Sequence, residues 1–399
     1  MADTASDFLV ERLHDRGIRR IYGFPGDGIN GEVPGDQWQK EGDGGMAQDA
    51  ATPWHVEASR YPATGPDIDK YRFLLRYAIL APSSHNTQPW LFRVYDDHLE
   101  VIADRSRALP VVDPIDRELV ISCGGAIGMI RASLLRFGYS GDIELLPDSA
   151  DKDLLARVKL GSPHEPTLAD QARFAAISRR RSTRRKFEDE PLPPGLAEEL
   201  GELAQLDELE LAVITGSEAK SDVAELVAEA DREQHKDPDF RKELSEWLSS
   251  RRTSSRDGMS LASFGAPDIL SSVGGFIIRT LDVGRRVAAN DKRLASNSPA
   301  LVVIATRDDS PRDWLAAGMM HVTALLAVTA RGLTAAYLNQ PIELAKFRAR
   351  LKGLAGVSGV PQLLFRIGRG PEVKPSVRRD LEEVLVRPPR ARVKSYAQS

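Results

Sequence analysis

The stretch LAPSSHNTQPW, residues 80–90, gathers short hydrogen-bonding side chains directly after an apolar helical pattern. Proline and serine end that pattern, so the following hydroxyl and amide groups stand on irregular backbone. Such a loop can simply cap the preceding helix, or it can present donors and acceptors to a polar ligand. The candidate contact residues are Ser83, Ser84, Asn86 and Gln88. His85 is expected to be a hydrogen-bonding surface histidine, because no second histidine stands at metal-ligand spacing.

The stretch RRRSTRRKF, residues 179–187, is the second feature that could do chemistry, with five arginines in positions 179–185. A planar guanidinium binds phosphate through two parallel hydrogen bonds, and Ser182 adds a hydroxyl. The pattern therefore predicts a phosphate site at Arg180, Arg181 and Ser182. A solvated basic turn is the alternative. Nucleic-acid binding is disfavoured, because aromatic residues are not interleaved and the net charge of the chain is -4.

The sequence shows no persuasive Ser-His-Asp triad and no pair of carboxylates spaced for acid–base catalysis. Asp104 and Asp113 are expected to be caps or turn residues. Cys123 beside two glycines is expected to be a packed small residue rather than a reactive thiol. We therefore expect no catalytic side chain and no metal site.

Composition limits the remaining possibilities. A chain of 399 residues exceeds one typical domain, so two domains or one duplicated unit are expected. The single cysteine excludes an intrachain disulfide and a cysteine-based metal cluster. The sequence shows no apolar run near 18 residues and no signal-peptide core, which favours a cytoplasmic protein without a membrane span. The small net charge gives no general attraction to nucleic acid or anionic lipid.

Hydrophobic periodicity divides the chain into two similar halves, expected at 66–165 and 166–388. The first half reads as a helix at YRFLLRYAIL, two strands joined at Asp96-Asp97, a long helix over 119–137 and a strand at GDIELLP. The second half repeats a long helix, DWLAAGMMHVTALLAVTARGL, after the strand SPALVVIATRDDS, and continues with TAAYLNQP and PQLLFRIGRGP. The shared order predicts an internal duplication.

A polar helical insertion is expected at 217–296, inside the second half. Its segment SSRRTSSRDGMSLASFG, residues 249–265, is rich in small and basic residues. It reads either as a surface excursion or as a lid with Gly258 and Gly265 as hinges.

The two ends of the chain are expected to be additions to these halves. Residues 1–31 resemble the opening of thiamine-diphosphate enzymes, but the resemblance stops near Gly31 and no metal–diphosphate segment follows. Residues 32–45 are polar and glycine-rich, which predicts a linker, so 1–45 forms an appended fragment. Residues 389–399 are expected to be a tail.

Four segments together resemble the nitroreductase superfamily of flavin enzymes. They are LAPSSHNTQPWLF, RRRSTRRKF, RGLTAAYLNQPIE and GVPQLLFRIGRGP, and their order is similar to that of the two-domain, Acg-type branch over about 66–388. The resemblance implies an α/β (α+β) nitroreductase-type fold, built as an internal pseudo-dimer. It also implies FMN as cofactor, NAD(P)H as reductant and a small nitro- or quinone-type electron acceptor. The alternative within this branch is a protein that stores FMN under a closed lid.

The same resemblance assigns expected roles by position. Arg180, Arg181 and Ser182 would hold the flavin phosphate, and the loop residues would line the ribityl chain and ring from the other half. Leu338, Asn339 and Gln340 would run along the ring near its reactive nitrogen, and Lys374 and Arg378 would reach the phosphate. Each signature segment occurs once, so one composite site is expected per chain, in a monomer or a homodimer.

Overall fold

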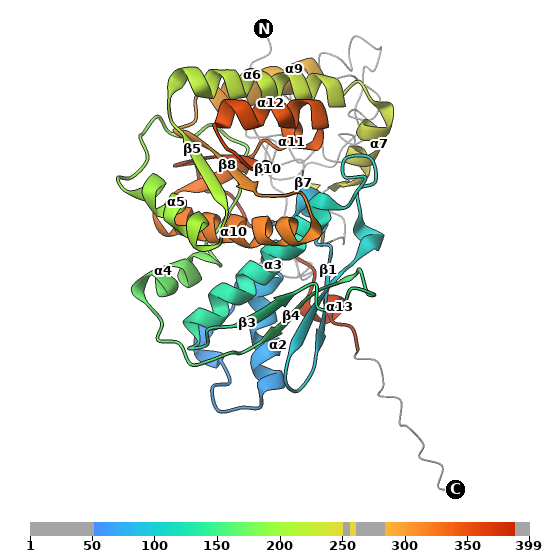
Figure 1. The fold of residues 1–399 in the computed structure, drawn as a ribbon, viewed down its shortest axis with the longest axis vertical. Coiled ribbons are helices and arrows are strands. Elements are labelled where there is room, and N and C mark those ends of the chain that lie inside the picture. The colour runs from blue at the N-terminus through green and yellow to red at the C-terminus, as the bar shows by residue number, and fades with distance from the viewer. Residues whose placement is uncertain (1–51, 250–255, 261–283, 388–399) are drawn as a thin grey trace, which may run out of the picture.

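The structure is a computed structural model that describes residues 52–249, 256–260 and 284–387. The expected N-terminal fragment 1–45, the tail 389–399 and Gly265 lie outside the described residues. Two four-stranded antiparallel sheets stand at opposite sides of a central pair of long helices (Figure 1).

The first half has one helix before its first strand and one long helix between its second and third strands in the sequence. Its elements are α2 (Asp67–Ala78), β1 (Trp90–Val94), β2 (Leu99–Ala103), α3 (Arg117–Arg136), β3 (Asp142–Leu145) and β4 (Leu154–Lys159). The predicted helix, hairpin and long helix are therefore confirmed. Strand β4 was not expected, although Leu154, Leu155 and Ala156 are buried in the sheet.

The second half is longer because it carries additional helices. Its strands are β5 (Glu210–Ile214), β8 (Ala300–Thr306), β9 (Thr334–Tyr337) and β10 (Val360–Gly368), with a small parallel pair, β6 (Leu248–Ser249) and β7 (Met259–Ser260). Its helices are α4 (Leu168–Ala176), α5 (Leu196–Leu206), α6 (Ser217–Gln234), α7 (Pro238–Glu246), α9 (Gly284–Ser296), α10 (Pro311–Ala330), α11 (Gln340–Glu343), α12 (Ala345–Ala355) and α13 (Leu381–Val384).

The two sheets have the same topology. The strand order is β1-β2-β4-β3 in the first sheet and β5-β8-β10-β9 in the second, and in each half the long helix follows the second strand. Residues 95–98 join β1 to β2, whereas residues 215–299 separate β5 from β8. The helices of the long excursion thus stand where the first half has a hairpin turn, and the shared topology supports the predicted duplication.

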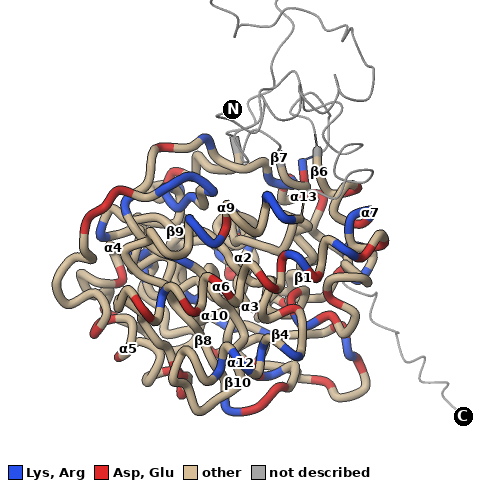
Figure 2. The backbone as a smooth tube through the Cα atoms, turned by 90° about the horizontal axis from the view of Figure 1, so that it is seen from above, with Lys and Arg blue, Asp and Glu red and all other residues tan. Residues whose placement is uncertain are grey.

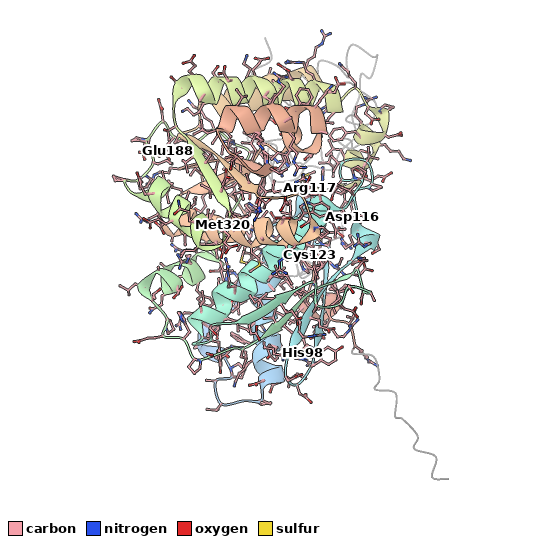
Figure 3. The ribbon with its side chains drawn as sticks, viewed as in Figure 1. His98, Asp116, Arg117, Cys123, Glu188 and Met320 are labelled. Atoms are coloured by element: carbon pink, nitrogen blue, oxygen red, sulfur yellow. The ribbon has the colours of Figure 1, made fainter. Side chains whose placement is uncertain are left out.

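The long helices α3 and α10 cross in backbone contact between the sheets. A Cβ atom added to Gly318 would lie 2.0 Å from the carbonyl oxygen of Ile121, and one added to Gly124 would lie 2.4 Å from that of Leu315. Glycine is required at such positions because any side chain would force the helices apart. Cys123 and Met320 are completely buried in the same helix pair (Figure 3).

Both crossing helices are long and apolar enough to cross a membrane by length and composition alone. Each has 20 residues, whereas the sequence was expected to hold no apolar run near 18 residues. In the structure 83% of the most apolar window of α3 and 78% of that of α10 are buried inside the protein. Their hydrophobicity is explained by the core, where a helix between two sheets is covered on all sides.

The end of the second half returns to the first sheet. The Val386 amide donates a hydrogen bond to the Phe92 carbonyl oxygen at 2.8 Å, and Leu385 forms a parallel bridge with the same strand residue. Helix α13 therefore lies beside β1 (Figure 1). This return brings the residues just before α13 to the loop that follows α2.

We predict that Gly318→Ala destabilises the protein because its methyl group would overlap the backbone of α3. The expected loss is about 3 kcal/mol of unfolding free energy, at the upper end of ordinary overpacking. Urea denaturation would measure it. Gly201→Ala is the matched control, because a Cβ at this helical glycine meets no atom within 4 Å. That variant should gain up to about 1 kcal/mol from helix propensity, and equal effects at both glycines would contradict the close crossing.

Candidate functional site at the junction of the two halves

Five segments that are separate in the sequence meet at the junction of the two halves. They are the segment around Trp54, the loop itself, the arginine segment 180–182, the short segment 256–260 and the stretch 376–380 that precedes α13. The loop belongs to the first half and the arginines to the second. The two motifs that the sequence singled out are therefore brought together across the junction.

The loop has an unusual backbone. His85, Asn86 and Gln88 have φ angles of 50°, 56° and 52°, in the left-handed region that side chains disfavour. Such a backbone conformation costs about 1–3 kcal/mol and persists only where the surroundings hold it. Three such residues occur within four positions of this loop, so its shape depends on the groups that pack around it.

Residues in the first turns of α3 contact the strained loop and hold it in place. The Ser84 hydroxyl donates a hydrogen bond to Glu118 Oε2 at 2.5 Å, and the Ser84 amide donates to Ser122 Oγ at 3.4 Å. The Cys123 thiol contacts the Pro89 carbonyl oxygen at 3.1 Å, and burial raises its pKa. Cys123 is thus a packed residue, as expected, and it anchors the end of the loop.

Arg180, Arg181 and Arg378 form what we call the arginine cluster. Arg180 Nη2 donates to the Leu80 carbonyl oxygen at 3.3 Å, and Arg378 Nη2 donates to the same oxygen at 3.3 Å. Both guanidiniums are only 3% exposed. Two buried cations from distant parts of the second half therefore share one carbonyl of the first half.

Asn86 and Ser182 complete the surroundings of this cluster. Arg378 Nη1 donates to Asn86 Oδ1 at 2.8 Å, and Asn86 Nδ2 donates to the Val377 carbonyl oxygen at 3.2 Å. Ser182 is exposed, and its hydroxyl oxygen lies 3.5 Å from Arg180 Nη1. Backbone pairing of Ser182 with Ala335 attaches the arginine segment to β9.

The cluster has little counter-charge among the described residues. Burial lowers the pKa of Arg180, and burial together with the charge of Arg180 lowers the pKa values of Arg181 and Arg378, while the charge of Glu372 partly opposes this at Arg181. None of these three arginines makes a salt bridge within the described ranges. Three guanidiniums that repel one another, and that pair with no carboxylate in this part of the chain, form a site suited to an anion of more than one negative charge.

Unpartnered polar atoms gather at the same place. Arg180 Nε, Arg378 Nε, Tyr337 Oη and His321 Nε2 are buried and make no hydrogen bond in the part of the chain that the structure describes. The His321 and Tyr337 rings are 5.4 Å apart, and burial and the charge of Arg180 lower the His321 pKa to about 3. Buried polar atoms are nearly always paired, so this group fits a ligand that brings acceptor oxygens.

The remaining loop residues are held by protein groups. Ser83 Oγ accepts a hydrogen bond from the Gln88 amide at 2.9 Å. Gln88 is fully buried; its Nε2 donates to the Arg256 carbonyl oxygen at 2.8 Å and its Oε1 accepts from the Arg379 amide at 2.8 Å. Ser83 and Gln88 therefore shape the loop, whereas Asn86 reaches the arginine cluster.

His85 is half-buried in the loop, whereas the sequence predicted a hydrogen-bonding surface histidine. Its Nδ1 atom is buried without a hydrogen-bond partner among the described residues, and burial followed by the charge of Arg184 lowers its pKa to about 4.

The LNQ segment and Lys374 are placed differently from the arginines. Leu338 is 2% exposed and packs in the core of the second half, and Asn339 Oδ1 accepts from the Leu364 amide at 3.0 Å. Gln340 Nε2 donates to Asp291 Oδ2 at 3.2 Å, while its Oε1 is buried and unpartnered among the described residues. Lys374 is exposed. Only Gln340 of this set has an unsatisfied polar atom.

Two acidic residues, Asp231 and Asp291, lie next to Gln340. Burial and the negative charge of Asp291 raise the pKa of Asp231 to about 8, and burial also raises the pKa of Asp291. Asp231 is 1% exposed, and its Oδ2 has no hydrogen-bond partner among the described residues. The pair therefore retains a proton at neutral pH. Its ionisable groups are acidic, whereas those of the arginine cluster are basic.

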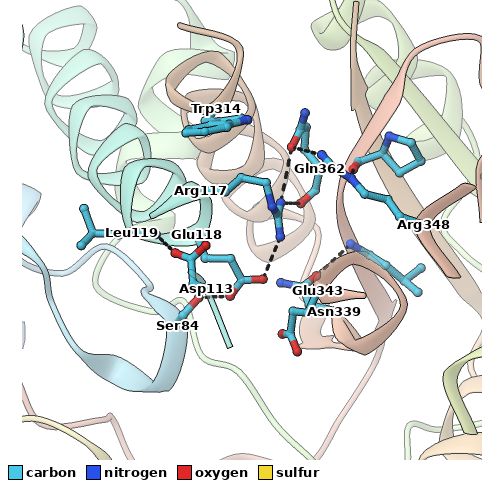
Figure 4. A network of polar contacts seen from close by, with 12 residues as sticks. Ser84, Asp113, Arg117, Glu118, Leu119, Trp314, Asn339, Glu343, Arg348 and Gln362 are labelled. Carbon is cyan, nitrogen blue, oxygen red and sulfur yellow. Dashed lines mark hydrogen bonds and ion pairs between the residues drawn. The ribbon is translucent and has the colours of Figure 1, made fainter. Parts of the chain in front are cut away.

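A further polar network connects the loop to the second half (Figure 4). Arg117 pairs with Glu118 at 3.1 Å and donates to the Gln362 carbonyl oxygen at 2.8 Å. Glu118 in turn accepts from Ser84. Asp113 acts as predicted: its Oδ2 accepts the Leu119 amide at 2.9 Å near the start of α3. These contacts fix α3 relative to β10.

Part of the segment expected to be a lid contacts the loop directly. The Asn86 Nδ2 atom donates to the Gly258 carbonyl oxygen at 3.1 Å, and Arg184 Nη2 lies 3.1 Å from Met259 Sδ. Asp257 pairs with Arg107, and Arg256 pairs with Asp380. Residues 256–260 therefore touch both halves beside the candidate site.

Sequence reasoning missed Trp54, Tyr337 and His321. Trp54 precedes the region of family resemblance and belongs to no periodic pattern. Tyr337 stands beside the predicted Leu338, and the alternation of a strand would have placed its side chain on the opposite face. His321 lies within an apolar helix, where a buried histidine has no distinguishing sequence signal.

Comparisons with known proteins converge on one family. The nitroreductase family model matches residues 177–369. A Mycobacterium tuberculosis H37Rv protein named "Putative NAD(P)H nitroreductase Rv3131" is 30% identical over 325 residues, which cover 80% of this chain and 92% of that protein. The product named for acg in the same strain is 26% identical over 333 residues, covering 81% of this chain and 97% of that protein.

A solved structure is also similar. The FMN-dependent nitroreductase NfnB from Mycobacterium smegmatis, crystallised in complex with NADPH, is 18% identical, and the match covers 53% of this chain and 96% of that one with a TM-score of 0.35.

We predict that Asp231→Asn stabilises the protein increasingly as pH rises. A carboxyl whose pKa is about 4 when unfolded and about 8 when folded binds more protons in the native state, so wild-type stability falls between these pH values. The variant lacks this loss. Its unfolding free energy relative to that of wild type should therefore be about 3 kcal/mol higher at pH 8.5 than at pH 5. Urea denaturation at both pH values measures it.

Asp222→Asn is the control for this change, because Asp222 lies exposed on the same helix. It should leave the pH dependence as it is in wild type. A pH dependence that Asp231→Asn leaves unaltered would contradict the raised pKa.

Proposed function

The chain belongs to the nitroreductase family, and we propose that it binds one FMN between its halves and acts as an NAD(P)H-dependent oxidoreductase. Its electron acceptors would be small nitro- or quinone-type compounds. Relatives named as NAD(P)H nitroreductases support this assignment. A bound flavin would take hydride from the nicotinamide and pass electrons to the acceptor, which is consistent with the lack of an evident catalytic side chain.

The observation that carries the proposal is the arginine cluster at the loop. A phosphate monoester bears up to two negative charges and several acceptor oxygens, which match three guanidiniums without a salt bridge and the buried Nε atoms of Arg180 and Arg378, which have no partner among the described residues. The Ser182 hydroxyl, exposed beside Arg180, would bind the adjoining polar chain. Asn86 would hold Arg378 in place, because its side chain bonds to Arg378 and to the Val377 and Gly258 carbonyl oxygens. The ring end of the ligand would extend toward Gln340.

Protein groups would set the electrostatic surroundings of the ring. Gln340 has an acceptor oxygen without a partner among the described residues and is held through its Nε2 by Asp291. Glu118, Ser122 and Cys123 fix the position of the strained loop. With both segments held by such contacts, the site would be preorganised and would orient its ligand with little rearrangement.

The second candidate is FMN storage with little turnover. The contacts of residues 256–260 with Asn86, Arg107, Arg184 and Asp380 favour it, because a segment bound to both halves would hinder a nicotinamide. Hydride transfer requires the reacting atoms to approach to roughly 3–3.5 Å. The two functions therefore differ in whether this segment opens.

We predict that Arg180→Ala weakens FMN about 10- to 100-fold, because a charge-assisted hydrogen bond contributes about 1.5–3 kcal/mol. Riboflavin, which has no phosphate, should bind nearly as well as to wild type. Fluorescence titration gives both affinities and should show one FMN per chain at saturation.

Arg179→Ala is the matched control, because Arg179 is the exposed neighbour of Arg180 and bonds only to the Ala175 carbonyl oxygen among the described residues. It should bind both flavins as wild type does. Equal losses of FMN and riboflavin in Arg180→Ala would show that this residue does not face a phosphate.

We predict that NADPH bleaches the FMN of the wild-type protein under anaerobic conditions, and that a nitroaromatic or quinone restores the absorbance. The variant Arg256→Ala/Asp257→Ala removes the ion pairs of the covering segment and should bleach faster. If only the variant bleaches, the segment is a permanent cover and the storage function is correct. If neither bleaches while both hold FMN, the oxidoreductase proposal fails.

A further inference from the structure

The arginine cluster surrounds a single aromatic ring, that of Trp54. The guanidinium carbons of Arg181, Arg378 and Arg180 lie 4.6, 4.9 and 5.8 Å from the ring centroid of Trp54. All three distances fall within the range of cation–π attraction. The tryptophan is 4% exposed, so the contacts are shielded from water. Cation–π attraction is stronger at such desolvated sites than at exposed ones.

A hydrogen bond fixes the ring in this position. Trp54 Nε1 donates to the Ser376 carbonyl oxygen at 2.8 Å, two residues before Arg378. The indole therefore binds the backbone of the stretch 376–380 and also contacts the side chain of Arg378 in that stretch. Trp54 precedes the first helix of the first half, whereas the three arginines all belong to the second half. It joins three segments that lie far apart in the sequence.

The chemical character of an indole suits it to this place. Its face attracts cations through the ring quadrupole, yet it accepts no hydrogen bond from their N–H groups. A carboxylate in the same position would also reduce the repulsion among the arginines, but it would pair with their N–H groups and neutralise them. A tryptophan offsets repulsion while the donors and the positive charge stay available to an anionic ligand.

We propose that Trp54 is the positioning residue of the phosphate end of the site and determines its selectivity for a phosphorylated over an unphosphorylated flavin. The inference rests on the proposed binding of FMN. Trp54 acts through the arginines and needs no contact with the ligand. It holds three mutually repelling guanidiniums together before the ligand arrives, so that binding requires less ordering of side chains.

The test compares dissociation constants for FMN and riboflavin in variants of the full chain. Trp54→Leu, and the unbranched Trp54→Met as a second variant, remove the aromatic face, and we expect the preference for FMN to fall about tenfold in each. Trp54→Phe keeps an aromatic face and should retain the preference within about threefold. Riboflavin affinity, expected to change little, shows in each case that the site is folded.

Trp314→Leu is the matched control. Trp314 is also buried, and its Nε1 donates to Asp309 Oδ1 at 2.6 Å, but the described residues give it no stacked arginine. Its replacement should lower the thermal midpoint and leave the FMN preference unchanged. The inference is overturned if Trp54→Leu and Trp54→Met weaken both flavins equally or keep the full preference, or if Trp54→Phe loses as much as they do.

A second readout separates this inference from the proposed function. Inorganic phosphate should raise the thermal midpoint of the wild-type protein more than that of Trp54→Leu, because the cluster binds the anion without the flavin. If the wild type binds no flavin, the FMN function fails, and the phosphate effect alone then decides the role of Trp54. An equal phosphate effect in the wild type and Trp54→Leu overturns the inference.

Discussion

The backbone contact between α3 and α10 is the constraint on which the rest of the structure depends. Gly124 and Gly318 let the helices approach until a single added methyl group would overlap the opposite backbone. Because no side chain can adjust at such a contact, the relative position of the two sheets is fixed closely. The same helix α3 then carries Glu118, Ser122 and Cys123, which hold the strained loop at the junction.

Charge is distributed unevenly around this junction although the chain as a whole is nearly neutral. Figure 2 shows basic and acidic residues interspersed along the backbone. Inside the protein, however, three arginines gather around Trp54 without a salt bridge in the described ranges, while Asp231 and Asp291 gather behind Gln340. Burial shifts the pKa values of both groups, with like-charge repulsion adding to the shift among the arginines and at Asp231, so both clusters are expected to matter for function rather than for stability.

The sequence predicted much of the fold because its elements follow strong local rules. The buried strand β8, the helices α2, α3 and α10, and the hairpin of β1 and β2 each have a clear hydrophobic period or turn signal. The prediction failed where the signal depends on distant partners. Strand β4 went unrecognised, and the burial of the His85 Nδ1 atom was not foreseen.

The sequence by itself determined the two motifs and their chemistry, since guanidinium, hydroxyl and amide groups have fixed hydrogen-bonding capacities wherever they stand. It also determined that each motif occurs once, and hence that a composite site would need both halves. Only the tertiary structure decided which of these groups meet. Asn86 and Arg378 come together, Gln88 is enclosed by protein partners, and Trp54 joins the arginines from outside the region of resemblance. The physical reason is that burial and like-charge repulsion depend on three-dimensional neighbours, which the order of residues along the chain does not specify.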